Sequence, residues 1–452
     1  MKINKRPLLI LLLCILVVGL TGCSSDTTVE SSYNTEKKTE SISLSDFRNA
    51  EEIQSFTDEG IAIIKINGKY GYIDVHGNTV VMPQYDKARD FSNGIAVVAT
   101  KIDDANVYGA INTQGEFVLP LKYKGGIGWY PEEEVFKVAE KPYGEGQTWK
   151  LLDRNGKALS DFEWDDIWSF ENNRAAVCKD DKWGVIDSAG QIIIEPKYED
   201  LRLEDDGKQI WVQMDNGDIC RIDENENVIK NINSIIDYTI KLAKSTNIVV
   251  ELDRDFWPFP TIWGDKEFFR ANIRQTVYGV NKDIYTIVMF DSYAISLLTL
   301  EKGYAVSFVH AAGDYAVLTL HPLTNKLPSI NYDVTYYCVI NKDGKTVISP
   351  MKDYILLNDG NPGVFHITHD KNHYLMSKHG IKLTKSYKWI EGPRNGYYLY
   401  QDNNGLWGYL NQDGSIAISA RYKKEGSFGA GYAPVLTEDG WHIINALGEI
   451  IY

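Results

Sequence analysis

Cysteine is scarce in this sequence of 452 residues, which contains only five. Cys14 and Cys23 lie near the N-terminus, whereas Cys178, Cys220 and Cys338 lie in apolar segments with the pattern of strands. Three is an odd number, which excludes a disulfide framework that pairs every cysteine beyond residue 23. We therefore expect these three to be buried free thiols.

Positive charge is also scarce. The sequence contains 47 lysines and arginines but 62 aspartates and glutamates, which gives a net charge of −15. This balance argues against a nucleic-acid partner. It also argues against electrostatic attraction to anionic lipid head groups.

Familiar catalytic motifs are missing. The sequence has no His-Glu-x-x-His helix, no Cys-x-x-Cys pair, no Gly-x-Ser-x-Gly turn and no glycine-rich phosphate loop. Acidic groups do occur at 132–134 and 165–166, and we interpret them as solvated loops. The sequence thus favours a protein that is not an enzyme and that needs no cofactor or metal.

The apolar run from Pro7 to Leu20 follows Lys2, Lys5 and Arg6 and is too short for a comfortable membrane span. This order of basic and apolar residues is typical of a secretory leader, which we place at residues 1–22. Its removal takes three positive charges from a net charge of −15, which leaves −18.

The leader ends in Leu20-Thr21-Gly22-Cys23, which resembles the lipobox of bacterial lipoproteins. The resemblance implies that Cys23 is acylated and becomes the N-terminus of an exported, membrane-anchored protein at the cell surface or in the periplasm. The alternative is a cysteine beside an ordinary cleavage site. Residues 23–48 are rich in Ser, Thr and Glu, so we expect a disordered tether between the lipid and the folded part.

A short phrase repeats along the rest of the chain. It is clearest from Lys182 to Gly190, and it returns from Lys69 to Gly77 and from Leu406 to Gly414. Its Asp or Asn position recurs every 34 to 41 residues, with one gap of 118. The nine positions are Asp74, Asn112, Asp153, Asp187, Asp223, Asn341, Ser377, Asn411 and Asn445.

Each repeat has the pattern of a three-stranded meander. Alternating apolar and polar residues around the aromatic residue indicate a half-buried strand, and Asp or Asn followed three residues later by Gly fits a turn. A second strand ends at a proline, as at Pro196, and a third follows a phenylalanine such as Phe91. One unit cannot bury its apolar faces alone, so neighbouring units must stack.

These residues resemble the WG-repeat family of bacterial proteins, over about 56–228 and 337–452. The resemblance implies a mainly β repeat scaffold without a general catalytic activity, which we assign to residues 49–230 and 335–452. Lys150, Tyr374 and His442 replace the second glycine of the motif, so a close backbone approach is not expected in those units. We favour a propeller-like array, with a solenoid as the alternative.

Residues 231–334 interrupt the repeats. Helical spacing predicts a helix near 232–244, and strand-like segments follow at 247–252, 276–280, 284–290, 294–300, 304–310 and 315–321. We therefore expect an α+β insert. The stretches 294–315 and 323–327 resemble a domain of lysozyme-sensing anti-sigma factors and some peptidoglycan deacetylases, which implies a binding module for a cell-wall or protein ligand.

Two clusters are candidate sites. Trp257, Phe259 and Trp263 lie within seven residues beside prolines and are suited to bind a sugar or a partner, or else to cover the core of the insert. Four of the eight histidines, at 366, 369, 373 and 379, lie within fourteen residues. Their places in the repeat do not require them to converge, so we expect no metal there. The turn Asp and Asn residues cap their own turns rather than share a calcium ion.

We interpret the protein as a non-catalytic envelope protein that binds a macromolecular or cell-wall ligand. One alternative is an envelope enzyme that acts on glycan or peptidoglycan. Another, implied only by the resemblance of the insert, is a sensor or inhibitor of a wall-degrading protein such as lysozyme. The expected partners are a membrane, through acyl chains, and a cell-wall or protein ligand, but no nucleic acid.

Overall fold

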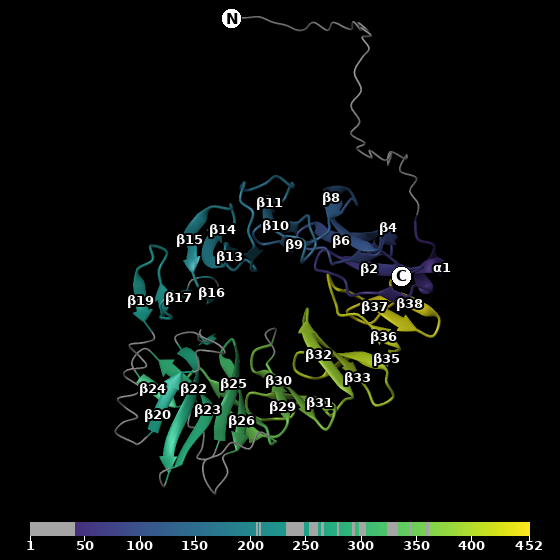
Figure 1. Ribbon diagram of the computed structural model, residues 1–452. Coiled ribbons are helices and arrows are strands. Elements are labelled where there is room, and N and C mark those ends of the chain that lie inside the picture. Colours follow the sequence, from purple (N-terminus) through teal and green to yellow (C-terminus); the bar gives the residue numbers. More distant parts are fainter. Residues whose placement is uncertain are drawn as a thin grey trace, which may run out of the picture. The chain divides into compact units, whose positions relative to one another are not determined.

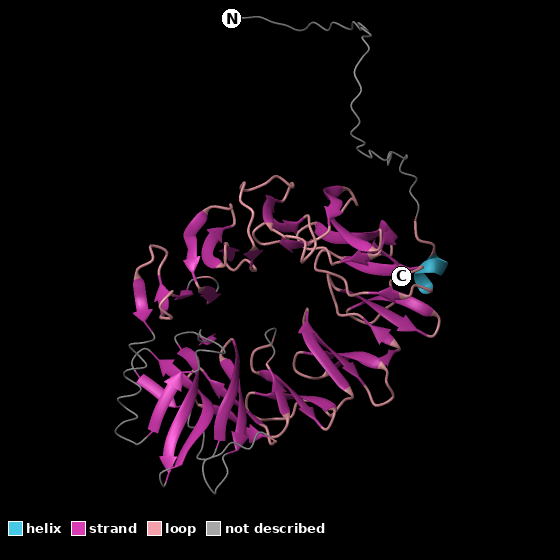
Figure 2. Cartoon of the chain, viewed as in Figure 1, coloured by secondary structure: helices cyan, strands magenta, loops and turns pink. Residues whose placement is uncertain are grey.

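The computed structural model describes residues 41–452 apart from 205–206, 208, 232–247, 253–260, 264–265, 278–279, 292–293, 298–303, 323–332, 344 and 358–360. The described part is mainly β, as the sequence predicts, with one short helix, α1 (Leu44–Arg48), ahead of the strands (Figure 2). Within it, no helix is long and apolar enough to cross a membrane. The leader, Cys23 and the predicted helix at 232–244 lie outside the described residues.

Five small antiparallel sheets follow one another before residue 232 (Figure 1). The first contains β1 (Glu52–Ile53), β2 (Ile61–Ile66), β3 (Lys69–Asp74) and β4 (Thr79–Tyr85). The second contains β5 (Lys87–Ala88), β6 (Ile95–Ile102), β7 (Ala105–Asn112) and β8 (Phe117–Tyr123), and the third β9 (Gly126–Tyr130), β10 (Val135–Ala139) and β11 (Lys150–Asp153). The fourth contains β12 (Asp166–Ile167), β13 (Arg174–Lys179), β14 (Lys182–Asp187) and β15 (Ile192–Tyr198), and the fifth β16 (Asp200–Glu204), β17 (Gln209–Gln213), β18 (Ile219–Ile222) and β19 (Val228–Asn231).

Four further repeat sheets lie in the C-terminal part. They are β25 (Tyr304–Ala312), β26 (Tyr315–Pro322), β27 (Tyr336–Asn341) and β28 (Thr346–Met351); then β29 (Tyr354–Leu356), β30 (Val364–His369) and β31 (Asn372–Ser377). β32 (Trp389–Arg394), β33 (Tyr397–Gln401), β34 (Trp407–Asn411) and β35 (Ile416–Tyr422) follow, and β36 (Lys424–Glu425), β37 (Tyr432–Thr437) and β38 (Gly440–Asn445) end the series. Among the nine repeat sheets, five begin with a short strand of two or three residues that the sequence does not predict: β1, β5, β12, β29 and β36.

The predicted insert, residues 231–334, contains a five-stranded sheet. Its strands are β20 (Ile248–Leu252), β21 (Thr261–Trp263), β22 (Lys266–Val277), β23 (Val280–Asp291) and β24 (Ala294–Leu297). A strand predicted at 276–280 is wrong, because β22 ends at 277 and β23 begins at 280, so this stretch joins two long strands. The predicted strands at 304–310 and 315–321 form β25 and β26. β25 pairs with β26, and β26 pairs with β27 across the boundary predicted at 334.

The predicted turns form as expected at the repeated Asp and Asn residues. Asp187 Oδ1 accepts hydrogen bonds from the backbone N–H groups of Ala189 at 3.0 Å and Gln191 at 2.8 Å. Gly190 completes the turn with φ of 79°, a conformation that a β-carbon disfavours. The same pair of bonds is accepted by Asp74, Asn112, Asp153, Asp223, Asn341, Ser377 and Asn445.

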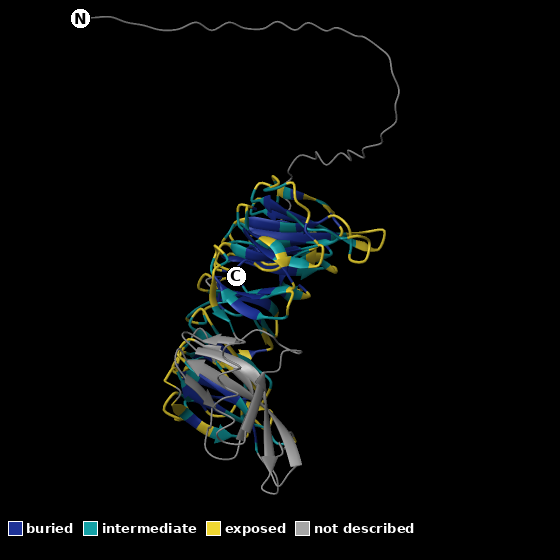
Figure 3. Cartoon of the chain, turned by 60° about the vertical axis from the view of Figure 1, so that its left-hand side comes forward, coloured by how far each residue is buried: buried dark blue, intermediate teal, exposed yellow. Residues whose placement is uncertain are grey.

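The hydrophobic cores lie between consecutive sheets, because each central strand is apolar on both faces. In β2, Ile61 and Ile63 pack toward the second sheet, whereas Ala62 and Ile64 pack on the other side. Alternate residues of a strand point to opposite faces, so one strand serves two cores. Figure 3 shows the result as buried strands with exposed connecting loops.

The motif glycine allows the last strand of a sheet to approach closely. A β-carbon on Gly184 would lie 2.4 Å from the carbonyl oxygen of Ile194 and 2.7 Å from the nitrogen of Pro196. The pairing of β14 with β15 shifts register at this point, as in a β-bulge. Gly71, Gly109 and Gly408 make the same approach.

Five units lack this glycine, and in three of them the sheet also lacks the last strand. Lys150, Tyr374 and His442 occupy its position in β11, β31 and β38, and each of these strands ends its sheet. The two units with cysteine here, Cys220 and Cys338, keep the last strand. Both thiols are free and buried, as is Cys178, which confirms the expectation for the three cysteines.

The two ends of the repeat array are in contact, with α1 beside β38 (Figure 1). Trp441 of the last sheet shares a core with Phe47 of α1 and Ile64 of the first sheet. Its indole Nε1–H donates to the carbonyl oxygen of Ala50 at 3.0 Å, and the N–H of Ser427 donates to Ser55 Oγ at 2.8 Å. The first and last repeat sheets of the described part therefore share one hydrophobic core.

We predict that Gly184→Ala lowers the free energy of unfolding by about 1–3 kcal/mol, because its β-carbon would push β15 away from β14. Urea unfolding measures the change. Gly128→Ala is the matched control, since a β-carbon there meets its nearest atoms at an ordinary 3.6 Å. Equal stability of the two variants would show that the close approach does not explain the motif glycine.

Candidate functional site

The aromatic cluster predicted in the insert lies largely outside the described residues. Trp257 and Phe259 are not described, and for Trp263 only the backbone is described, at the end of β21. Their role as a binding surface therefore stays a prediction.

The four clustered histidines do not converge on one point. His366 on β30 and His373 on β31 are buried, with His366 Nε2 and His373 Nδ1 2.8 Å apart. His369 instead contacts Asp353, with Nδ1 2.5 Å from Oδ1, and His379 lies exposed in a turn. Among the residues for which side chains are described, no group of three or more His, Cys, Asp or Glu is placed to hold a metal.

The surroundings of two of these histidines shift their pKa values in opposite directions. Burial, assisted by the charge of His373, lowers the pKa of His366 to about 4. The hydrogen bond with Asp353 raises the pKa of His369 above its ordinary value. The buried pair is thus held neutral near pH 7, which suits a structural role in the core between two sheets.

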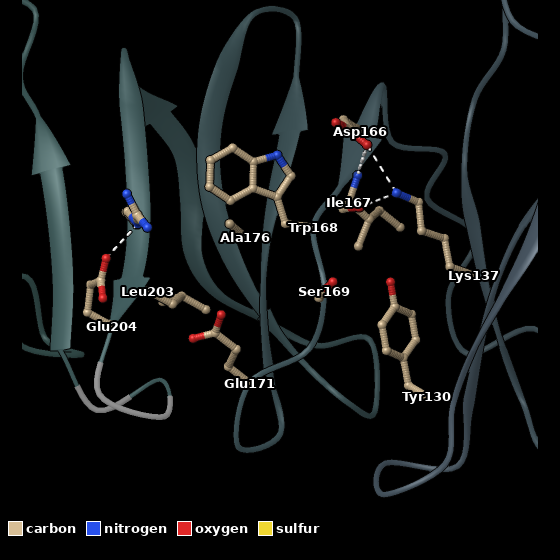
Figure 4. A pocket seen from close by; sticks show the side chains of 11 residues that line it. Tyr130, Lys137, Asp166, Ile167, Trp168, Ser169, Glu171, Ala176, Leu203 and Glu204 are labelled. Atoms are coloured by element: carbon tan, nitrogen blue, oxygen red, sulfur yellow. Dashed lines mark hydrogen bonds and ion pairs between the residues drawn. The ribbon is translucent and has the colours of Figure 1, made fainter. Parts of the chain in front are cut away.

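A cavity of about 510 Å³ lies where the third, fourth and fifth sheets meet. It is lined by residues of β9, β10, β12, β13 and β16 and of the segment that follows β12 (Figure 4). Its volume is in the range typical of small-ligand pockets. It is the best candidate for a functional site in the described part of the chain.

Lys137 of β10 forms one side of this pocket. Its Nζ lies 3.1 Å from Asp166 Oδ1, donates to the carbonyl oxygen of Ile167, and lies 4.1 Å from the centre of the Trp149 ring. The side chain is only 13% exposed, and this burial lowers the pKa of Lys137. Asp166 belongs to strand β12, so the interpretation of 165–166 as a plain solvated loop is wrong for this residue.

A second ion pair and a third carboxylate lie across the pocket. Arg202 Nε is 2.5 Å from Glu204 Oε1, and the Glu204 side chain is 16% exposed. Burial raises the pKa of Glu204, the charge of Arg202 opposes this effect, and the neighbouring charge of Glu171 adds to it. Figure 4 shows Lys137 and Glu204 on opposite sides, with Glu171 between them.

Aromatic rings supply the apolar part of the lining. Trp168 is 42% exposed, and its ring packs edge-on against Trp183 with the centroids 4.8 Å apart. Tyr130 is half-buried and contacts the hydroxyl of Ser169, and burial raises its pKa. The pocket therefore combines an accessible indole face with charged hydrogen-bonding groups.

Sequence reasoning missed this pocket, although a signal for it is present. Trp168 follows its Asp-Asp pair at the position that Arg89 and Gly426 occupy in other units. Trp168 is a large aromatic residue at a position where other units have none, and this difference could have indicated a site in this unit. Nothing in the sequence indicates that Lys137, which belongs to another unit, lines the same pocket.

A family model described as "WG containing repeat" matches residues 51–70, 70–100, 108–127, 151–183, 183–217 and 407–441. The chain contains WG repeats. Five of the matches fall in the first five sheets, and the sixth begins in β34 and extends into β38. No curated protein matches the sequence of this WG-repeat protein.

Solved structures show only distant similarity. The chain aligns over 79% of its length with 95% of a structure titled "Crystal structure of the eukaryotic initiation factor", at 10% identity and a TM-score of 0.41. It aligns over 81% with 95% of Hsv2p from Kluyveromyces lactis, at 9% identity and a TM-score of 0.27. It aligns over 89% with 39% of a tricorn protease, at 10% identity and a TM-score of 0.21.

We predict that acidification from pH 6.5 to about 4 destabilises the protein in part through His366. Its folded pKa lies below the ordinary value, so the unfolded chain takes up the proton first and stability falls over this window, by up to about 3 kcal/mol. Urea unfolding of His366→Gln at pH 7 and pH 4.5 should show a smaller decrease than the parent protein. His379→Gln, an exposed control, should follow the parent, and an unchanged decrease in His366→Gln would contradict the prediction.

Proposed function

We propose that this WG-repeat protein is an exported, lipid-anchored envelope protein that binds a cell-wall glycan in the pocket beside Trp168 and does not cleave it. The observation that carries the proposal is the accessible indole of Trp168 in a cavity that also holds both signs of charge. The lipobox-like segment that ends at Cys23 supports the location.

The chemistry of the lining suits a sugar. A pyranose ring has an apolar C–H face that packs on an aromatic ring, and its hydroxyls need donors and acceptors around its edge. Trp168 offers the ring, and it is held edge-on by Trp183. Arg202, Glu204 and Glu171 offer charged hydrogen-bonding groups around it.

The positions of the lining residues also suit a rigid binding site. They come from neighbouring sheets whose strands bury both faces, so their backbones are fixed by two cores. A site held in this way loses little conformational entropy when a ligand binds. Repeat arrays commonly use such seams to present a wide surface.

An enzyme that cleaves glycan is the second candidate. Glu171 and Glu204 line the same pocket, and burial raises the pKa of Glu204, as a general acid requires. We favour binding because Glu204 is already engaged by Arg202 at 2.5 Å, a contact that favours the charged carboxylate and opposes the effect of burial on its pKa. Mass spectrometry of peptidoglycan fragments after incubation distinguishes the two, since product release that Glu204→Gln abolishes would establish the enzyme.

We predict that Trp168→Ala weakens binding of soluble peptidoglycan fragments at least about fivefold, because stacking on one ring is worth about 1 kcal/mol or more. Isothermal titration calorimetry measures the affinity. Trp389→Ala is a matched control, since Trp389 is similarly exposed at 45% but does not line the pocket. Loss of binding in both variants, or in neither, would remove Trp168 from the site.

We predict that Cys23→Ser abolishes fatty-acid labelling and shifts the protein from the membrane to the soluble fraction of the host cells. Metabolic labelling with an alkyne fatty acid, followed by fractionation, measures both effects. Cys178→Ser is the control, because that cysteine is a buried thiol within the repeats. Labelling that persists in Cys23→Ser would refute the anchor but would leave the glycan site untouched.

A further inference from the structure

We propose that Lys137 is a positioning residue of the pocket, whose ammonium group fixes the peptide bond before Trp168 and so holds the indole ring in place for a sugar. This inference rests on the proposed glycan-binding function. It assigns part of the affinity to a residue that does not touch the ligand. It follows from the place of Lys137 in its repeat and from the contacts of its side chain.

Lys137 departs from the pattern of the repeat. It lies at the middle of β10, opposite Leu151, which is two places before the turn residue Asp153. The matching residue is hydrophobic and buried in seven other repeat sheets: Ile63, Val97, Ala176, Trp211, Val317, Leu399 and Pro434. In the remaining sheet it is His366, which burial keeps neutral near pH 7. A charge at such a place costs stability, so its presence there indicates a functional role.

The three N–H donors of the Lys137 ammonium group are occupied. Its Nζ lies 3.1 Å from Asp166 Oδ1, donates to the carbonyl oxygen of Ile167, and lies 4.1 Å from the centre of the Trp149 ring. Two hydrogen bonds and one aromatic face account for all three donors. Lys137 therefore lines the pocket without being placed to bind a ligand itself.

These contacts end on the backbone beside Trp168. Strand β12 is the first strand of the fourth sheet, and among the described strands it pairs only with β13. The Ile167 N–H donates to Asp166 Oδ1 at 2.7 Å, and the Ile167 carbonyl accepts from Lys137. The N–H of Trp168 donates to the carbonyl of Ala176 at 2.9 Å. The peptide group between Ile167 and Trp168 is thus held at both ends, by Lys137 and by β13.

A fixed backbone matters here because the Trp168 ring is 42% exposed. Figure 4 shows the contacts of Lys137 with Asp166 and Ile167 directly beside this ring. Trp183 packs on the ring edge-on, with the centroids 4.8 Å apart. A ring that is held before the ligand arrives loses less conformational entropy on binding. Lys137 therefore strengthens binding through Trp168.

The experiment measures binding of soluble peptidoglycan fragments by calorimetry and the fluorine NMR resonance of Trp168 in protein labelled with fluorotryptophan. Loss of this resonance in Trp168→Phe identifies it. Lys137→Met keeps the length of the side chain and places an apolar residue where other sheets have one, so its midpoint of urea unfolding should be no lower than that of the parent. It should weaken binding about threefold or more and shift the Trp168 resonance, as expected for the loss of one hydrogen bond.

Two further variants serve as rescue and control. Lys137→Arg retains the charge and the donors, so it should restore affinity to within about twofold of the parent. Lys150→Met removes a lysine of the neighbouring strand β11, which pairs with Glu163 at 2.8 Å and does not line the pocket. This control should leave both the affinity and the Trp168 resonance unchanged.

A double variant separates positioning from direct contact. If Lys137 acts through Trp168, adding Lys137→Met to Trp168→Ala should lower the affinity by less than about twofold more. A lysine that touches the ligand would instead contribute its full factor of about three in both backgrounds. Should Lys137→Met fail to fold, Asp166→Ala, which changes a half-exposed residue of the same ion pair, takes its place with the same expected effects.

The outcomes separate this inference from the function on which it rests. Unchanged binding in Lys137→Met, an unmoved Trp168 resonance, or a full additional loss in the double variant overturns the positioning role and leaves glycan binding in place. Absence of fragment binding by the parent protein refutes the glycan site. The fluorine resonance then still decides whether Lys137 positions Trp168, because it is measured without a ligand.

Discussion

The structure depends on strands that are apolar on both faces. A strand such as β2 presents Ile61 and Ile63 to one neighbour and Ala62 and Ile64 to the other, so no sheet is complete without sheets on both sides. The first and last sheets would each expose one such face if they were apart. They bury these faces against each other, because Trp441, Phe47 and Ile64 share a core. Burial of this apolar area removes both ends of the array from water.

The same constraint explains where the pocket lies. Hydrophobic clusters fill the seams between the third, fourth and fifth sheets, and the pocket lies beside two of these clusters, since Ile167 belongs to one and Leu203 to the other. Lys137, Asp166 and Glu204 come from three sheets and are brought together only because those sheets stack. Their partial burial strengthens the charge interactions, which would count for little on an open surface.

Much of the fold could be predicted from local patterns in the sequence. Alternation of apolar residues, the Asp or Asn of each turn and its glycine indicated the strands of each unit, and the structure confirms a mainly β repeat array. The short first strands could not be predicted, since two residues such as Asp166–Ile167 are too few to carry a periodic pattern. The site was missed because its residues are distant in sequence, and the aromatic cluster favoured in its place lies largely beyond the described residues.

The sequence by itself determined the repeat, its turns, the buried cysteines and the excess of negative charge, because each depends on residues close together in the chain or on composition alone. Only the tertiary structure decided why the motif glycine is needed: Gly184 gives room to the backbone of Ile194 and Pro196. It also decided that the two ends of the array meet and that Trp168 shares a pocket with Lys137 and Glu204. These features depend on which sheets touch, and contact between sheets is a property of the packed chain rather than of any one repeat.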